Sequence, residues 1–169
     1  MTAAMSFVGI DPGLSGALAF LGMAEDGTIR TLQVRDMPIF TITNNKHKRR
    51  EIDTQSLAQA IRLWAPHLVV VERVHSMPGQ GVASSFTFGQ GYGEIRGVTA
   101  ALALPVEFVG PRVWKKALGV TSDKDTSRRA ASMLFPRHAA YWSRKKDDGR
   151  AEAALLAWYG WRQMSKPIQ

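Results

Sequence analysis

The chain has 169 residues, of which 45% are hydrophobic and 21% charged, and it contains no cysteine. A chain of this length and composition is expected to form one globular domain over residues 1–169. No apolar run approaches the ~20 residues that cross a bilayer, and the N-terminal residues lack the basic region of a signal peptide. We therefore expect a cytoplasmic protein without membrane segments or disulfides.

The charge balance is strongly basic. Lysine and arginine number 22 against 14 aspartate and glutamate residues, which gives a net charge of +8. If some acids are committed to a metal site, the rest of the surface is more positive still. This favours a polyanionic partner, the alternative being a basic protein with no such partner, because net charge informs on partners rather than on fold.

Three short strands are predicted at the start of the chain. Residues 6–11 form an apolar run that ends in a Pro-Gly turn after Asp11. Residues 17–23 resume the apolar run, the Asp-Gly pair that follows favours a hairpin, and residues 28–37 alternate between apolar and polar. The three segments together predict an antiparallel meander.

A loop, a helix and a central strand are expected next. Residues 41–50 are polar and basic, which predicts an exposed loop. Asp53 or Thr54 can cap a helix that Pro66 ends. Residues 68–72 are apolar without alternation, as in a strand covered on both faces.

The second half of the chain is mainly helical. A helix is expected over residues 86–104 although it contains four glycines, which close packing on another element would explain. The remaining expected elements are a strand over residues 105–109 and helices over residues 111–118, 121–135 and 148–162. The order predicts an α/β fold with a mixed five-stranded sheet flanked by helices.

Four acidic residues stand in places that suit a metal site. Asp11 and Glu72 end apolar strands, whereas Asp148 and Glu152 are four positions apart at the start of the last helix. Carboxylates in this arrangement suit a hard divalent cation such as Mg²⁺. The alternative is that Asp11 serves a turn, Glu72 pairs with Arg73 or a lysine, and Asp148 caps the helix.

The three acidic motifs resemble those of a known nuclease family. G-I-D-P-G-L-S-G, V-V-V-E-R-V and K-K-D-D-G-R-A-E-A-A-L-L-A, in this order, resemble the RuvC family of Holliday-junction resolvases, or crossover junction endodeoxyribonucleases, and above all its shorter phage-type members. The resemblance covers residues 7–159. It implies a ribonuclease H-like fold and two Mg²⁺ ions per active site, with Mn²⁺ as a possible substitute, and the residues implied as catalytic metal ligands are Asp11, Glu72, Asp148 and Glu152.

The last motif departs from the best-known family pattern. Its final acid, Glu152, is a glutamate where the pattern has an aspartate, and Asp148 precedes it by four positions where many members have three. Both spacings keep the two acids on one helical face. Asp147 is the second choice for the fourth ligand.

The resemblance also implies a reaction and partners. It implies a structure-selective endonuclease that nicks four-way DNA junctions symmetrically and leaves 5′-phosphate ends. The alternatives are a nuclease for other branched DNA, such as flaps and forks, and a non-catalytic junction-binding module. The family is homodimeric, and its pairing helix corresponds to residues 86–104, with Phe86, Phe88, Tyr92 and Ile95 as candidate contacts.

A basic surface is expected beside the acids. Several lysines and arginines, together with one histidine, are candidates for phosphate or base contacts: Lys115, Lys116, Lys124, Arg128, Arg129, Lys145, Lys146 and His75. The alternative for each is an ordinary solvated position. Residues 77–81 either wedge into an opened junction or simply link strand to helix, and Trp114, Trp158 and Trp161 are assigned to the core.

Overall fold

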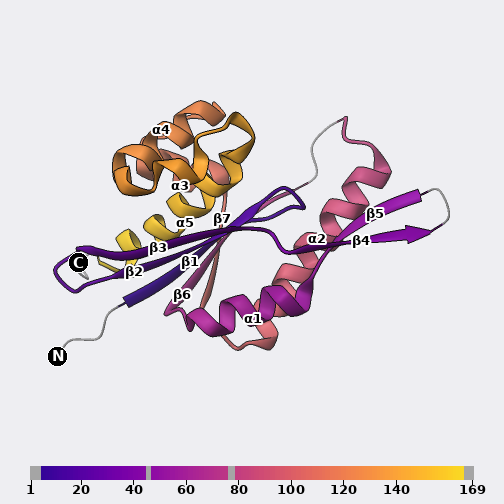
Figure 1. Cartoon of the computed structure of the whole chain (residues 1–169), viewed down its shortest axis with the longest axis horizontal. Helices are drawn as coiled ribbons and strands as arrows, with labels where there is room; N and C mark the ends of the chain where they lie inside the picture. Colours follow the sequence, from indigo (N-terminus) through magenta and orange to yellow (C-terminus); the bar gives the residue numbers. More distant parts are fainter. Residues whose placement is uncertain (1–4, 45–46, 76–78, 166–169) are drawn as a thin grey trace.

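A mixed sheet of five strands forms the centre of the molecule (Figure 1). The computed structural model describes residues 5–44, 47–75 and 79–165, without the side chains of His47 and Lys124. Within these residues the sheet has the order β3-β2-β1-β6-β7. β1 pairs antiparallel with β2 and parallel with β6, and the strands are β1 (Met5–Asp11), β2 (Ala17–Met23), β3 (Ile29–Asp36), β6 (Leu68–Glu72) and β7 (Val106–Val109). The predicted meander and the mixed five-stranded sheet are confirmed.

Helices cover both faces of this sheet. One face carries α1 and α2, and the other carries α5, over whose N-terminal part α3 and α4 pack (Figure 1). No helix of the described residues is long and apolar enough to span a bilayer. The helices are α1 (Thr54–Trp64), α2 (Val82–Ala101), α3 (Pro111–Leu118), α4 (Lys124–Leu134) and α5 (Asp148–Met164), with short 3₁₀ turns η1 (Pro136–Trp142) and η2 (Lys145–Asp147).

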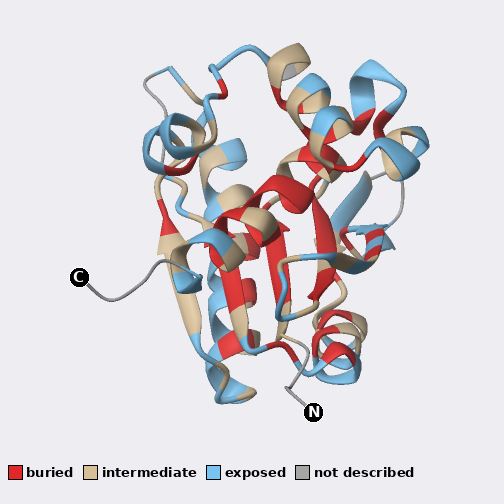
Figure 2. Ribbon diagram, turned by 90° about the vertical axis from the view of Figure 1, so that its left-hand side faces the viewer, coloured by how far each residue is buried: buried red, intermediate tan, exposed pale blue. Residues whose placement is uncertain are grey.

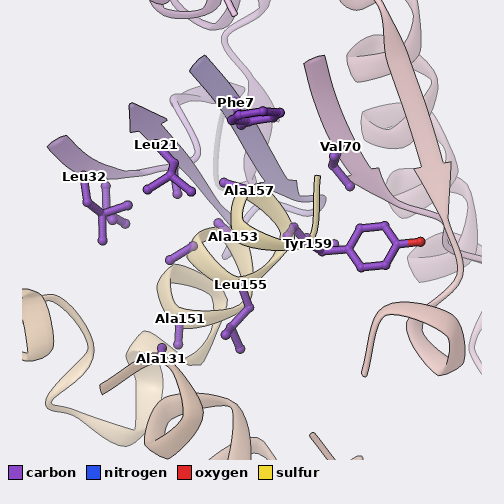
Figure 3. Packing of buried hydrophobic residues seen from close by; sticks show 14 of the residues in the cluster. Phe7, Leu21, Leu32, Val70, Ala131, Ala151, Ala153, Leu155, Ala157 and Tyr159 are labelled. Atoms are coloured by element: carbon purple, nitrogen blue, oxygen red, sulfur yellow. The ribbon is translucent and has the colours of Figure 1, made fainter. Parts of the chain in front are cut away.

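The core divides into two layers because strand side chains alternate. Phe7 on β1 packs towards α5, whereas its neighbour Val8 packs towards α1 and α2. The buried residues gather in the central strands and in α5 (Figure 2). Figure 3 shows Ala153 and Ala157 of α5 near the strands of the sheet. Gly9 has no side chain, and a Cβ there would collide with the carbonyl oxygen of Ala153. α5 therefore packs almost directly on the backbone of β1.

One element was predicted wrongly. Residues 41–44 and 47–50 of the expected loop are strand, since β4 (Ile39–Asn44) and β5 (His47–Ile52) pair antiparallel as a separate two-stranded sheet, and residues 45 and 46 lie outside the described residues. The run Ile-Phe-Thr-Ile-Thr is rich in strand-forming residues, but its position beside a basic cluster favoured a loop. We call this pair of strands the β4–β5 ribbon.

Two helix starts also differ from expectation. α2 begins at Val82 rather than at residue 86, and α4 begins at Lys124 rather than at residue 121. Asp123 caps α4 by accepting a hydrogen bond from the backbone N–H of Asp125, which fixes where the helix starts. The start of α1 after Asp53 is confirmed, because that carboxylate accepts from the N–H of Ser56.

Candidate active site

Two of the four acids end neighbouring parallel strands. β1 and β6 pair with Ile10 opposite Val71, so the next residues, Asp11 and Glu72, end the two strands side by side. Side chains alternate between the faces of a sheet, which puts both carboxylates on the face that carries α5. The other two acids, on the first two turns of α5, therefore belong to the same side of the sheet.

Glu72 lies in a partly buried place beside an indole. Its Oε2 accepts a hydrogen bond from Nε1 of Trp114 at 2.7 Å. Burial raises the pKa of the Glu72 carboxyl, against the opposing effect of the Trp114 hydrogen bond, and the nearby Glu152 charge raises it further. Two carboxylates that repel each other in a partly desolvated place favour a cation between them.

Glu152 already has a cationic partner. Nζ of Lys115 donates to its Oε1 at 2.8 Å, and the buried Oγ of Ser127 donates to the same oxygen at 3.0 Å. The Lys115 and Glu152 side chains are only 17% and 12% exposed. This lysine also lowers the pKa of the Glu72 carboxyl, so its charge acts on both glutamates.

Asp11 and Asp148 line a common cleft. The cleft has a volume of about 590 Å³, and its walls are the turn after β1, the N-terminal half of α2 and the start of α5. Gly149, next to Asp148, lets the two elements meet: a Cβ there would lie 2.7 Å from Oδ2 of Asp11. Gly13 has φ of +126°, a conformation that only glycine adopts readily, and it faces Phe88 across the cleft.

Asp147 and Asp148 have different environments. The Asp147 carboxylate is 6% exposed and accepts two hydrogen bonds from the guanidinium of Arg144, at 2.8 and 2.9 Å. These hydrogen bonds lower its pKa, and Arg150 lies 3.8 Å from it. Asp147 thus has a structural ion pair, whereas Asp148 lines the cleft with Asp11.

The four carboxylates suit a divalent metal ion in their chemistry, although they do not surround a single ion position. Among the residues that the structure describes, no three acidic or histidine side chains are grouped closely enough to hold a metal ion. Four carboxylates nevertheless come from two strand ends and one helix, and one of them, Glu152, already holds the cationic ammonium group of Lys115. All-oxygen ligands of this kind suit Mg²⁺ or Mn²⁺.

The predicted phosphate contacts divide into exposed and paired residues. Arg128 donates to the carboxylate of Asp125 and to the carbonyl of Ser143, and Lys115 pairs with Glu152. The side chain of Lys124 and residues 77 and 78 of the predicted wedge lie outside the described residues. The exposed candidates are Lys116, Arg129, Lys145, Lys146 and His75.

Several other expectations about single residues are settled by burial and contacts. Ile95 is fully buried against the sheet, so its prediction as a contact between subunits is wrong. Trp114 is fully buried and Trp158 packs on Phe135, as expected for core residues. Glu72 does not pair with Arg73, whose guanidinium donates to the carbonyl of Phe108.

Two residues of the site were missed as functional positions. Trp114 was assigned only to the core, yet its indole N–H holds Glu72, and Ser127 was not singled out although its hydroxyl holds Glu152. Such partners fix the orientation of carboxylate ligands. The nearest signal in the sequence is Lys115, the neighbour of Trp114, which is expected on a basic surface beside the acids.

Comparison with solved structures identifies the fold. RuvC of Thermus thermophilus in complex with a Holliday junction substrate superposes with a TM-score of 0.59 and 18% identity, over 97% of this chain and 99% of that one. The yeast mitochondrial Holliday junction resolvase Ydc2 superposes with a TM-score of 0.54 and 16% identity, over 93% of this chain and 80% of that one. The fowlpox virus resolvase, solved with Holliday junction DNA, superposes with a TM-score of 0.54 and 15% identity, over 93% of this chain and 99% of that one.

The comparisons by sequence give no match. No protein-family model and no curated protein matches this chain. The fold is therefore that of RuvC and other Holliday junction resolvases, with the mixed five-stranded sheet of the ribonuclease H-like class.

Proposed function

We propose that the chain is a divalent-metal-dependent endonuclease that nicks four-way DNA junctions symmetrically and leaves 5′-phosphate ends. The observation that carries this proposal is the register of β1 and β6, which sets Asp11 beside Glu72 on the sheet face where α5 supplies Asp148 and Glu152. The resolvase fold and the net charge of +8 support a nucleic-acid substrate.

The four carboxylates would hold two Mg²⁺ ions, or Mn²⁺ in their place. Such ions would supply charge stabilisation at the scissile phosphate and a hydroxide nucleophile near neutral pH. Trp114 and Ser127 keep Glu72 and Glu152 in fixed orientations by hydrogen bonds. Glu152 would give up the ammonium group of Lys115 when a metal is present, and Lys115 would then contact the negatively charged phosphate.

A basic rim would hold the DNA near these acids. Lys116 on α3 and Arg129 on α4 are exposed, as are Lys145 and Lys146 immediately before α5. Lysine and arginine bind phosphates without reading base sequence, which suits selection by shape. His75 is exposed just after β6 and would contact DNA at the same end of the sheet.

We further propose that two copies pair through α2. Gly89, Gly93 and Gly97 recur at every fourth position, and no described atom outside the helix lies within 4 Å of where their Cβ atoms would be. Phe86, on the same face, is 70% exposed. A dimer with two-fold symmetry would present two active sites to the two strands that a symmetric reaction cuts.

The dimer can be tested without disturbing the protomer. Gly93→Glu adds charge at an exposed position of α2, and Leu63→Glu, at an exposed position of α1, is the matched control. The mass from sedimentation velocity should fall to that of a monomer for Gly93→Glu alone. A monomeric wild type, or a dimer that tolerates Gly93→Glu, would contradict this interface.

The function itself is tested by cleavage of a labelled immobile four-way junction in Mg²⁺. Paired symmetric nicks are expected from the wild type and from Glu25→Gln, an exposed acid outside the site, and no nicks from Asp11→Asn or Glu72→Gln or with EDTA. Glu72→Gln keeps an oxygen for the Trp114 N–H, so the fold should survive.

The absence of cysteine suits a reducing cytoplasm, where we place the enzyme.

Other outcomes of the same assay would select another function. Equal cleavage of equimolar fork, flap and junction would indicate a broader branched-DNA nuclease. Tight junction binding without cleavage in either Mg²⁺ or Mn²⁺ would indicate a binding module. Neither alternative is favoured by a structural feature of its own.

A further inference from the structure

The β4–β5 ribbon is unused by the proposed reaction. It extends away from the five-stranded sheet beside α2 (Figure 1), and its strands pair with each other. Only its base joins the core, where Ile52 is buried and packs close to Gly91 of α2. The ribbon is held further out by a hydrogen bond of 2.7 Å from Arg49 to Gln90.

The two faces of the ribbon differ in chemistry. Residues that pair across antiparallel strands lie on the same face, so the pairs Thr41–Arg50 and Thr43–Lys48 share one face. These four side chains are exposed, each can donate a hydrogen bond, and none is acidic. We call them the Thr–Lys–Arg face.

The opposite face is apolar and partly neutralised. The pairs Phe40–Glu51 and Ile42–Arg49 lie there, with Phe40 44% and Ile42 42% exposed. Arg49 is engaged with Glu51 at 2.7 Å, so this face offers little free positive charge. Among the described side chains of the ribbon, the cations available to a polyanion are therefore Lys48 and Arg50, on the Thr–Lys–Arg face.

The ribbon is continuous with the catalytic cleft. Ile52 at its base lines the cleft together with Asp11 and Asp148. Next to the cleft, Arg50 and Ile52 line a smaller pocket against α2. A six-residue strand is about 20 Å long, so the ribbon reaches well beyond the cleft wall.

We propose that the Thr–Lys–Arg face binds the sugar-phosphate backbone of one duplex DNA arm that leads away from the cleft. Hydroxyl and cationic donors without acids are the groups that contact phosphate oxygens in DNA complexes. This inference rests on the proposed function, because it assumes that branched DNA occupies the cleft. It adds a second contact area, on the far side of the acids from α3 and α4.

The test compares the wild type with two double variants in how their affinity for a four-way junction depends on salt. The junction has long arms, and EDTA is present so that no cleavage occurs. Lys48→Gln/Arg50→Gln removes two charges from the ribbon, and Arg30→Gln/Arg62→Gln removes two from exposed positions on β3 and α1 away from the cleft. Loss of two phosphate contacts should make the slope of log K against log salt shallower by about 1.8. The affinity advantage of the wild type should then shrink about tenfold between about 50 and about 200 mM salt. The control should keep the wild-type slope.

Two further variants make the result specific. Thr41→Val/Thr43→Val removes hydroxyl groups but keeps β-branched side chains, so it should weaken binding a few-fold without changing the slope. On junctions whose arms are cut to a few base pairs, the wild type and Lys48→Gln/Arg50→Gln should bind alike, because the ribbon then has no duplex to contact.

The contrary outcomes are separable. A ribbon variant with the wild-type salt slope on long arms overturns the inference and leaves the proposed function intact. A wild type that neither binds nor cuts the junction overturns both. If Lys48→Gln/Arg50→Gln keeps the slope but loses the dimer mass in sedimentation, the ribbon is a contact between subunits instead.

Discussion

Nζ of Lys115 lies 2.8 Å from Oε1 of Glu152, inside the group of acids proposed to bind metal. The lysine ammonium therefore supplies, within the chain itself, a positive charge that the carboxylates need. It also lowers the pKa of the Glu72 carboxyl, so the one ammonium group serves both glutamates. In the proposed enzyme, metal binding would be coupled to release of Lys115 from Glu152.

Replacing Lys115 should make the protein more dependent on metal. Lys115→Met leaves the partly buried Glu152 without its ion pair, which should cost about 2 kcal/mol of unfolding free energy in EDTA. Mg²⁺ should then raise the melting temperature more in the variant than in the wild type. Thermal unfolding with and without Mg²⁺ measures both effects, and equal Mg²⁺ shifts in the two proteins would refute the coupling.

The indole of Trp114 should matter for catalysis through its N–H. Trp114→Phe keeps an aromatic ring in the core but removes the donor to Glu72, and loss of such a ligand partner should lower cleavage about 10–100-fold. Trp142→Phe is the matched control, since its N–H bonds Ser132 instead of an acid of the site. Single-turnover nicking rates should separate the two variants, and equal losses would assign Trp114 a purely structural role.

The absence of a side chain at Gly149 should be required for activity. Gly149→Ala would place a methyl group 2.7 Å from Oδ2 of Asp11, and a displacement of this acid should lower cleavage by about 100-fold or more. Gly160→Ala on the same helix meets Val70 in the core, also at 2.7 Å, away from the acids. Both variants should lose about 1–3 kcal/mol of stability, but only the first should lose activity disproportionately. Unfolding and nicking should be measured in parallel for both variants, and equal losses of activity in the two would contradict the prediction.

The ion pair between Asp36 and Arg150 should show in the pH dependence of stability. Arg150 holds both oxygens of Asp36, at 2.6 and 2.7 Å, and the hydrogen bonds lower the pKa of that carboxyl. A lowered pKa in the folded state adds stability above the pKa of the unfolded chain, and this stability is lost as pH falls through the folded-state pKa. The melting temperature of Asp36→Asn should therefore lie below that of the wild type near neutral pH, and the difference between the two should shrink in acid.

Melting curves between about pH 6 and about pH 2 test this convergence. The difference should be small, because the Asp36 side chain is 66% exposed and solvent screens the pair. A difference that stays constant over the whole range would show that the carboxylate charge is not its cause.

The sequence predicted the sheet and the positions of the acids because both depend on local patterns. Asp11 and Glu72 follow short apolar runs that are typical of buried strands, and Asp148 and Glu152 share a helical face by spacing alone. The partners of these acids depend on tertiary packing. No local pattern could show that Ser127 and Trp114 reach Glu152 and Glu72 across 25 and 42 residues.

The β4–β5 ribbon was missed for a different reason. Strand formers at residues 39–43 are followed by a basic cluster, and positive charge is common in both loops and exposed strands. The alternation of Thr41, Thr43, Lys48 and Arg50 on one face is visible only when the pairing register is known. Register is set by the whole hairpin and not by any single residue.

Gly9 has a consequence for how this protein can change over generations. A methyl group at this position would collide with the carbonyl of Ala153 and the N–H of Ala157, so α5 rests on β1 with no side chain between them. The gap between the strand that carries Asp11 and the helix that carries Glu152 is thus set by two main chains. A side chain at position 9 would push α5 away from β1 and separate the acids, so this position can change only together with the main chain of α5.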